Sequence, residues 1–252
     1  MNAGKCSVQC SGRSNAGGKG TQIQYQTIPI LSCNEGFKVL GTMVTMNGNA
    51  DIEFEARLAA AWAKFHSLSS LLLKSDASEI RRLRLFDATV TKSALRCSET
   101  WNLTVSQKRR LRTTQRAMLR KMVAPKRRPD EDYIAWVKRG TRASEQKAER
   151  AGVSCWLKTH LRAKWRWAGR LARMPNDRWA RRATKWRDAE WWNHQDKSSR
   201  SRPLRCRQGR FRRWEDELVT FATAQHWEQW TTAATTADWD THEEEFVNFT
   251  WR

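Results

Sequence analysis

The stretch 154–187 combines the two kinds of side chain that recognise a nucleic-acid strand. A single acid, Asp177, stands among its cations, which are Lys158, Arg162, Lys164, Arg166, Arg170, Arg173, Arg178, Arg181, Arg182, Lys185 and Arg187. Four tryptophans lie between them: Trp165, Trp167, Trp179 and Trp186. Cations neutralise phosphates and flat rings stack on bases, so this composition fits a polyanion with exposed bases. Two amphipathic helices that bury their tryptophans would explain the rings as well, but a core does not require the excess of charge.

A second group of residues matches a catalytic pattern. Pro129-Asp130 followed by Glu145-x-Lys147 reproduces the PD and (D/E)xK elements of a large nuclease class. In that class two carboxylates hold a divalent cation and the lysine supports the attacking water. Such a site needs adjacent strands, whereas Asp130 has the position of a helix cap and Glu145 with Lys147 lies in a helix-forming run. A metal-dependent nuclease therefore remains only an alternative.

Charge and composition restrict the class of partner. The 252 residues carry a formal net charge of +21 with a pI near 10.5, which predicts an acidic partner, RNA or DNA before an anionic membrane. The sequence has no apolar run of about 18 residues and no secretory leader, so we expect an intracellular protein of nucleus or cytoplasm, with no membrane partner. The six cysteines and five histidines form no paired metal-binding spacing, and no cofactor is expected in this chain.

Periodicity predicts a mainly α fold after a short N-terminal antiparallel β element. The expected strands are Cys6–Cys10, Gln22–Ile30 and Phe37–Thr45. A helix from Asp51 is expected to place Phe54, Leu58, Phe65, Leu68 and Leu72 on one face, at spacings of three and four. Capping boxes at Asp76/Glu79 and Thr104/Gln107 open the next two helices, the second with Leu111, Met118 and Met122 inward. A cap at Asp130 opens a short helix that stops at Gly140, and a further helix over Glu145–Arg150 ends at Gly152. A further helix places Leu157, Leu161, Trp165, Ala168 and Leu171 inward until Pro175. A small acidic and aromatic helical pair closes the chain and could pack against the basic helices.

Five segments, in order, resemble the C-terminal part of reverse transcriptases from non-LTR (LINE-type) retrotransposons. FKVLGTMVT (37–45), with the helix after it, resembles that family's F-K-Y-L-G segment, and LRCSETWNLT (95–104) resembles Y-G-C-E-T-W. RWAGRLARMPNDRW (166–179) resembles W-x-G-H-V-x-R-M, and RQGRFRRWEDEL (207–218) resembles G-R-P-x-x-R-W-x-D-x-L. The last tryptophans, from Trp230 through Trp239 to Phe246, resemble its closing W…A-x-D-R-x-x-W…F. The order and spacing agree from about Gly36 to Val247.

The resemblance implies a division of the chain. Residues 1–48 would be the end of a polymerase palm, 49–124 a thumb-like helical bundle and 125–192 a basic, Trp-rich connecting region. A linker over 193–209 and a C-terminal helical segment over 210–252 would complete it. By the same resemblance a short segment would support the primer terminus: Phe37, Lys38, Val39, Leu40 and Gly41.

The resemblance has departures. Arg170 stands where the family often has His, Phe211 replaces its Pro, and Ser98 is inserted before Glu99. The family's catalytic Tyr/Phe-x-Asp-Asp turn does not occur in the sequence, and we expect it before Met1 or in a palm-containing partner chain. Mg²⁺ is expected only for that missing palm.

These observations together predict a fragment that binds RNA or an RNA:DNA hybrid, mainly through phosphates. The expected contacts are Arg109, Arg112 and Arg116 in the thumb-like bundle, and Arg162, Lys164, Arg166, Arg170 and Arg173 in the central helix. Trp165 or Trp167 is expected to stack on a base or a strand end. The alternatives are part of an active RNA-directed DNA polymerase, the nuclease described above, and a structural or non-functional retroelement remnant.

Overall fold

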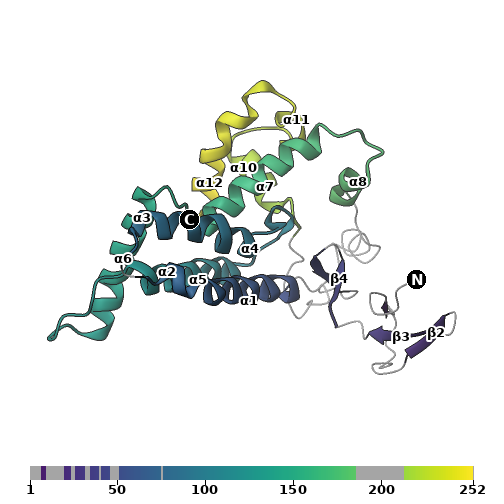
Figure 1. The fold of residues 1–252 in the computed structure, drawn as a ribbon. Coiled ribbons are helices and arrows are strands. Elements are labelled where there is room, and N and C mark those ends of the chain that lie inside the picture. Colours follow the sequence, from purple (N-terminus) through teal and green to yellow (C-terminus); the bar gives the residue numbers. More distant parts are fainter. Residues whose placement is uncertain are drawn as a thin grey trace, which may run out of the picture. The chain divides into compact units, whose positions relative to one another are not determined.

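The computed structural model describes residues 7–9, 20–23, 26–31, 35–39, 41–45, 51–74, 76–185 and 213–251, which are mainly α-helical (Figure 1). The predicted mainly α fold with a short N-terminal β element is confirmed. The chain divides into two compact units: unit 1 is Met1–Cys97 with Ser106–Trp156, and unit 2 is Ser98–Val105 with Leu157–Arg252. The predicted linker, 193–209, lies outside the described residues. No helix within the described ranges is long and apolar enough to span a membrane.

The N-terminal strands differ from the prediction in number and direction. Strand β1 (Val8–Gln9) pairs in parallel with β3 (Gln26–Leu31), while β2 (Gly20–Ile23) pairs with β3 in antiparallel register from Gly20↔Pro29 to Ile23↔Gln26. The single strand predicted over Gln22–Ile30 was therefore wrong, because two strands share that segment. The β element is also not wholly antiparallel, because β1 and β3 run in the same direction.

The segment 37–45 is also two strands instead of the predicted one. Strand β4 (Phe37–Val39) pairs antiparallel with β5 (Thr42–Val44), from Phe37↔Val44 to Val39↔Thr42. Gly41 between them has φ +87°, a conformation that glycine adopts without the steric cost of a side chain. The chain reversal depends on Gly41 because side chains rarely adopt this backbone conformation.

Helix α1 (Asp51–Ser67) holds this hairpin and forms the centre of unit 1. The carboxylate of Glu53 accepts the amide of Met43 at 2.5 Å, and Arg57 donates to the carbonyl of Gly41. The other face buries Phe54, Leu58, Ala61 and Phe65, at the predicted spacings of three and four. The helix ends earlier than predicted, and α2 (Ser69–Leu72) follows as a separate turn.

Helix α5 (Val105–Val123) lies beside α1 and runs in the same direction (Figure 1). Polar pairs along both helices set this alignment: Gln107 with Asp51 at 2.6 Å, Arg110 with Glu55 at 2.7 Å, and Lys121 over the ring of Trp62 at 5.6 Å. The inward residues of α5 include the predicted Leu111, Met118 and Met122, and all three are buried.

Helix α3 (Glu79–Phe86) continues through the π-helical turn η2 (Asp87–Thr91) into α4 (Lys92–Ala94). Its cap position is Ser78, so the predicted capping box from Asp76 is wrong; Asp76 instead pairs with Lys74 at 3.3 Å. Arg82 lies buried and donates to the carbonyls of Leu72 and Met122, at 3.0 Å each. It thereby satisfies carbonyls at the ends of α2 and α5 that lack helical partners.

Helix α6 (Tyr133–Arg150) is one long helix where two were predicted. Its cap is Asp132, whose Oδ2 accepts the amides of Ile134 and Ala135 at 2.8 and 3.1 Å, and not Asp130. Gly140 lies buried inside the helix and does not end it. A Cβ added to Gly140 would lie 3.5 Å from the Cβ of Ala124, an ordinary packing distance. The helix stops as predicted at Gly152, which has φ +79°.

Unit 2 is built around α7 (Trp156–Ala172). The segment 98–105, with the turn η3 (Ser98–Thr100), belongs to it. The remaining described elements are α8 (Trp179–Lys185), α10 (Asp216–Ala224), α11 (Trp230–Ala233), η4 (Ala237–His242) and α12 (Glu243–Trp251). All five predicted inward residues of α7 are buried. The compact units thus divide the chain within 125–192 and not at the predicted borders, because α6 packs with α3 and α7 packs with the C-terminal helices.

Candidate nucleic-acid interface

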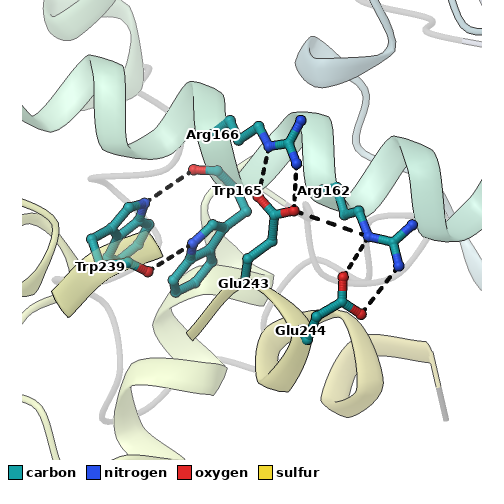
Figure 2. Close-up of polar contacts among 6 residues, drawn as sticks. All are labelled: Arg162, Trp165, Arg166, Trp239, Glu243 and Glu244. Atoms are coloured by element: carbon teal, nitrogen blue, oxygen red, sulfur yellow. Dashed lines mark hydrogen bonds and ion pairs between the residues drawn. The ribbon is translucent and has the colours of Figure 1, made fainter. Parts of the chain in front are cut away.

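Trp165 lies in the core of unit 2. Its ring has no exposed surface and stacks on Trp239, with 3.6 Å between centroids and 2° between planes. Each indole donates to the other residue's carbonyl: Nε1 of Trp165 at 3.1 Å and Nε1 of Trp239 at 3.3 Å (Figure 2). A Cβ on Gly169 would lie 2.6 Å from Nε1 of Trp239, so this glycine makes room for the pair. The prediction that Trp165 stacks on a base is wrong, because both ring faces are covered.

Lys164 is also a structural residue. Its side chain is 0% exposed, and Nζ lies 2.7 Å from Oε2 of Glu217 on α10. The ammonium group also lies over the ring of Trp214, 5.4 Å from the centroid. A buried cation with a carboxylate partner cannot meet a phosphate in this conformation. The prediction of Lys164 as a nucleic-acid contact is therefore corrected.

Arg162 and Arg166 are engaged by the acidic start of α12 (Figure 2). Arg162 donates to Glu244 from Nε at 2.6 Å and Nη2 at 3.1 Å, and Arg166 donates to Glu243 at 2.7 and 2.8 Å. These hydrogen bonds raise the pKa of both guanidinium groups, and Arg162 lowers the pKa of Glu244. The expected packing of the acidic tail on the basic helix is confirmed, and it leaves both arginines with carboxylate partners.

We expect this pairing to make unit 2 less stable in acid. The pKa of Glu244 is lower in the folded protein, so its contribution is complete above the carboxyl's unfolded value of about 4.3 and is lost as the pH falls through the folded value. The pair is largely exposed, so its size should be a few tenths to about 1 kcal/mol. Urea unfolding over a pH series would measure it. In Glu244→Gln this part of the pH dependence should vanish, and an unchanged acid slope would contradict the assignment.

The cations near the end of α7 have a different environment. Arg170, Arg173, Met174, Pro175, Asp177, Arg178, Trp179 and Ala180 line an open hollow of about 780 Å³. Arg170 and Arg178 are exposed, and among the described residues of the lining Asp177 is the only acid. Arg173 is exposed as well and donates to the carbonyl of Ala234 at 3.2 Å. This surface is therefore concave and strongly positive.

Trp179 makes the hollow suitable for stacking. Its side chain is 80% exposed at the first position of α8, and the guanidinium of Arg182 lies 5.3 Å from its ring centroid. Arg181 donates to the carbonyls of Ala172 and Met174, so α8 is tied to the end of α7. Trp167, the other ring expected to stack, is half-buried beneath the guanidinium of Arg170 at 5.8 Å.

The sequence-based site did not include Trp179 or Arg178. Both belong to the basic stretch, and one explanation of its tryptophans was that amphipathic helices bury them. A signal against that was available. The sequence of α8, WARRATK, has no second large apolar residue three or four positions from Trp179, and a lone ring cannot form an apolar face.

The predicted contacts in the thumb-like bundle are only partly accessible. Arg109 is exposed on α5 and Arg112 is half-buried. Nε of Arg116 donates to Glu145 on α6 at 2.7 Å, so this arginine already has an acidic partner. The structure therefore leaves Arg109 as the most accessible of the three, and their role stays a prediction.

The nuclease pattern is not assembled. Glu145 pairs with Arg116, while Nζ of Lys147 lies 2.7 Å from Glu79 and 3.1 Å from the carbonyl of Val123. Glu145 and Lys147 lie on α6 and Asp130 in an exposed turn, whereas the pattern requires adjacent strands. Within the described part of the chain, no group of three or more His, Cys, Asp or Glu side chains could hold a metal ion.

The segment predicted to support a primer terminus forms β4 and the turn after it. Phe37 is half-buried, Lys38 and Val39 are exposed, and Gly41 is the turn glycine; Leu40 lies outside the described residues. Its proposed role stays a prediction.

Comparisons of the chain with protein-family models, with curated proteins and with solved structures gave no match.

Proposed function

We propose that this protein binds RNA or an RNA:DNA hybrid through the hollow between α7 and α8. Arg170, Arg173 and Arg178 contact phosphates, and Trp179 stacks on a base or a strand end. The single observation that carries the proposal is the largely exposed ring of Trp179 within a concave, basic surface. An exposed ring beside cations has the two features that sequence-tolerant stacking on a nucleic-acid strand requires, a free aromatic face and charges for the phosphates.

The distribution of acids on α7 supports this choice of surface. The carboxylates of Glu244, Glu217 and Glu243 engage Arg162, Lys164 and Arg166, and among the described residues no such ion pair is found for Arg170, Arg173 or Arg178. Phosphates would gain most from cations that no carboxylate already neutralises, because binding there releases counterions without breaking an ion pair. The net charge of +21 favours the same class of partner.

We further propose that this binding belongs to the C-terminal region of a reverse transcriptase of the non-LTR retrotransposon type. The five resembling segments support this, and RWAGRLARMPNDRW covers the α7–α8 junction itself. In this proposal polymerisation requires a palm with its own metal ions, supplied by another segment or a partner chain. In the same proposal, this chain binds the template or the hybrid.

The proposal predicts a steep salt dependence that involves the hollow. Binding of a labelled single-stranded RNA, followed by fluorescence anisotropy, should weaken linearly in log Kd against log salt. Replacing Arg170, Arg173 and Arg178 by Gln should lower the slope by roughly 2, about 0.7 for each lost phosphate contact, and weaken binding by about tenfold at physiological salt.

A matched control removes the same charge elsewhere. Arg81, Arg84 and Arg150 are exposed in unit 1, and their replacement by Gln should affect binding less than the triple change in the hollow. Equal losses in both variants would mean that net charge alone attracts the RNA. A wild-type protein whose binding ignores salt would contradict the electrostatic mechanism.

A further inference from the structure

Several side-chain hydrogen bonds hold the exposed loop between α5 and α6 in one conformation. Glu131 receives a two-pronged contact from Arg139, with Nε at 2.7 Å and Nη2 at 2.6 Å. Nη2 of Arg139 also donates to the carbonyl of Lys126 at 3.0 Å, and the amide of Arg128 donates to Glu131 at 3.2 Å. The hydrogen bonds from Arg139 hold the pKa of Glu131 at about 2, so the carboxylate stays ionised at physiological pH.

Two more contacts fix the ends of this loop. Nε1 of Trp136 donates to the carbonyl of Pro125 at 3.0 Å, and Nε of Arg127 donates to the carbonyl of Glu131 at 2.8 Å. The loop and the first turns of α6 extend beyond α2 and α5 within unit 1 (Figure 1). The loop backbone is therefore held in one shape at a projecting end of the unit.

The side chains on this fixed loop are cationic and aromatic. Lys126, Arg127 and Arg128 are exposed, and Tyr133 and Ile134 on the first turn of α6 are 60% and 61% exposed. Two of the three nearby acids are already engaged. Glu131 binds Arg139 and Asp132 caps α6, while Asp130 is exposed and makes no such contact among the described residues.

We infer that the loop 125–132 is a second, preorganised contact for the phosphate backbone of the RNA or hybrid, with Tyr133 placed to stack on a base. The contacts of Glu131, Arg139 and Trp136 hold the loop in one shape before a ligand arrives, so binding to it loses less conformational entropy than binding to a flexible loop would. Three adjacent cations beside an exposed ring fit a strand that offers phosphates and a base. This inference rests on the proposed function and adds a contact in the other compact unit.

Replacing Glu131 tests the inference, because the expected change in RNA affinity is opposite to the change that charge alone predicts. Removing a negative charge beside a polyanion site should strengthen binding. If Glu131 holds the loop in its binding shape, Glu131→Gln should instead weaken binding by severalfold in the full-length protein. Asp130→Asn is the matched control, because it removes an acid of the same loop that carries no such contact, and its affinity should equal or exceed that of the wild type.

Anisotropy titrations with single-stranded RNA and with an RNA:DNA hybrid measure both variants, and circular dichroism checks that each is folded. An affinity of Glu131→Gln at or above that of the wild type overturns the inference. A direct variant, with Lys126, Arg127 and Arg128 changed to Gln, should lower the salt slope by roughly 2. An unchanged slope overturns the inference even if the hollow between α7 and α8 is confirmed.

Two further outcomes separate this inference from the proposed function. If the variants of this loop weaken RNA binding while the variants of the hollow do not, the loop contact stands and the assignment to the hollow fails. Vesicles containing anionic lipid serve as a second probe, because exposed Tyr133 and Ile134 beside cations would also suit a membrane surface. Binding to vesicles that requires Tyr133, without binding to RNA, overturns the inference.

Discussion

Glu217→Ala is expected to destabilise unit 2 by about 3–5 kcal/mol, because it leaves the ammonium group of Lys164 buried without its partner. The side chain of Lys164 is 0% exposed and that of Glu217 is 8% exposed, so the carboxylate is lost from a site with little access to water. The contact with the face of Trp214 remains, but a ring quadrupole compensates a buried ammonium much less than a full negative charge does. Chemical denaturation followed by circular dichroism measures the loss.

The matched control replaces both partners. Lys164→Met with Glu217→Leu keeps the volume apolar and removes both charges, so we expect a stability near that of the wild type or above it. A double variant as unstable as Glu217→Ala would show that packing, and not the uncompensated charge, causes the loss. A cost below about 1 kcal/mol for Glu217→Ala would place the pair in solvent and contradict the burial seen in the structure.

The sequence contained the signal for the burial of Lys164. This residue follows Leu161 by three positions and precedes Ala168 by four, which puts it on the same face as the predicted apolar residues. Charge suggested a solvent position, while periodicity placed the residue inside. Periodicity decided the outcome, because a carboxylate from α10 was there to accept the ammonium group.

The pairing of the other arginines could not be predicted residue by residue. Arg162 and Arg166 are four apart, so they share a face of α7. Their partners come from an acidic run about eighty residues later in the chain: the contacts to Glu244 and Glu243 span 82 and 77 positions. The acidic run suggested packing against a basic helix, but the register between two distant helices is set by the tertiary fold. The stacking of Trp239 on Trp165 depends on the same tertiary register.

Local signals failed where several residues competed for one role. The segment PDEDY offers two aspartates, Asp130 and Asp132, that could each cap a helix, and the choice of Asp132 depends on where α6 begins. Gly140 resembles a helix stop, but a buried position against α5 allows the helix to pass through it. Gly41 was included in the predicted strand Phe37–Thr45 because apolar residues lie on both sides of it. Its positive φ marks a reversal that continuity does not indicate.

Trp165→Ala is expected to cost unit 2 about 3–5 kcal/mol, the usual range for removing a fully buried aromatic ring. The change removes the stacking on Trp239 and leaves that residue's carbonyl without the indole donor. It also opens a cavity next to Phe221 and Phe246, whose rings lie 5.5 and 4.8 Å from that of Trp165. Thermal and urea unfolding would measure the loss, and a change within about 0.5 kcal/mol would contradict the buried stack.

Trp179→Ala is the informative counterpart, because the same substitution in the same basic stretch should have the opposite profile. The ring of Trp179 is largely exposed, so stability should stay within about 0.5 kcal/mol of the wild type while RNA binding weakens by roughly 1–3 kcal/mol.

Trp165→Ala should affect binding only as far as it unfolds unit 2, and its loss of binding should shrink as the temperature is lowered. If both variants lost binding without losing stability, both rings would have to reach the RNA. The reciprocal hydrogen bonds between Trp165 and Trp239 could then not persist in the bound state.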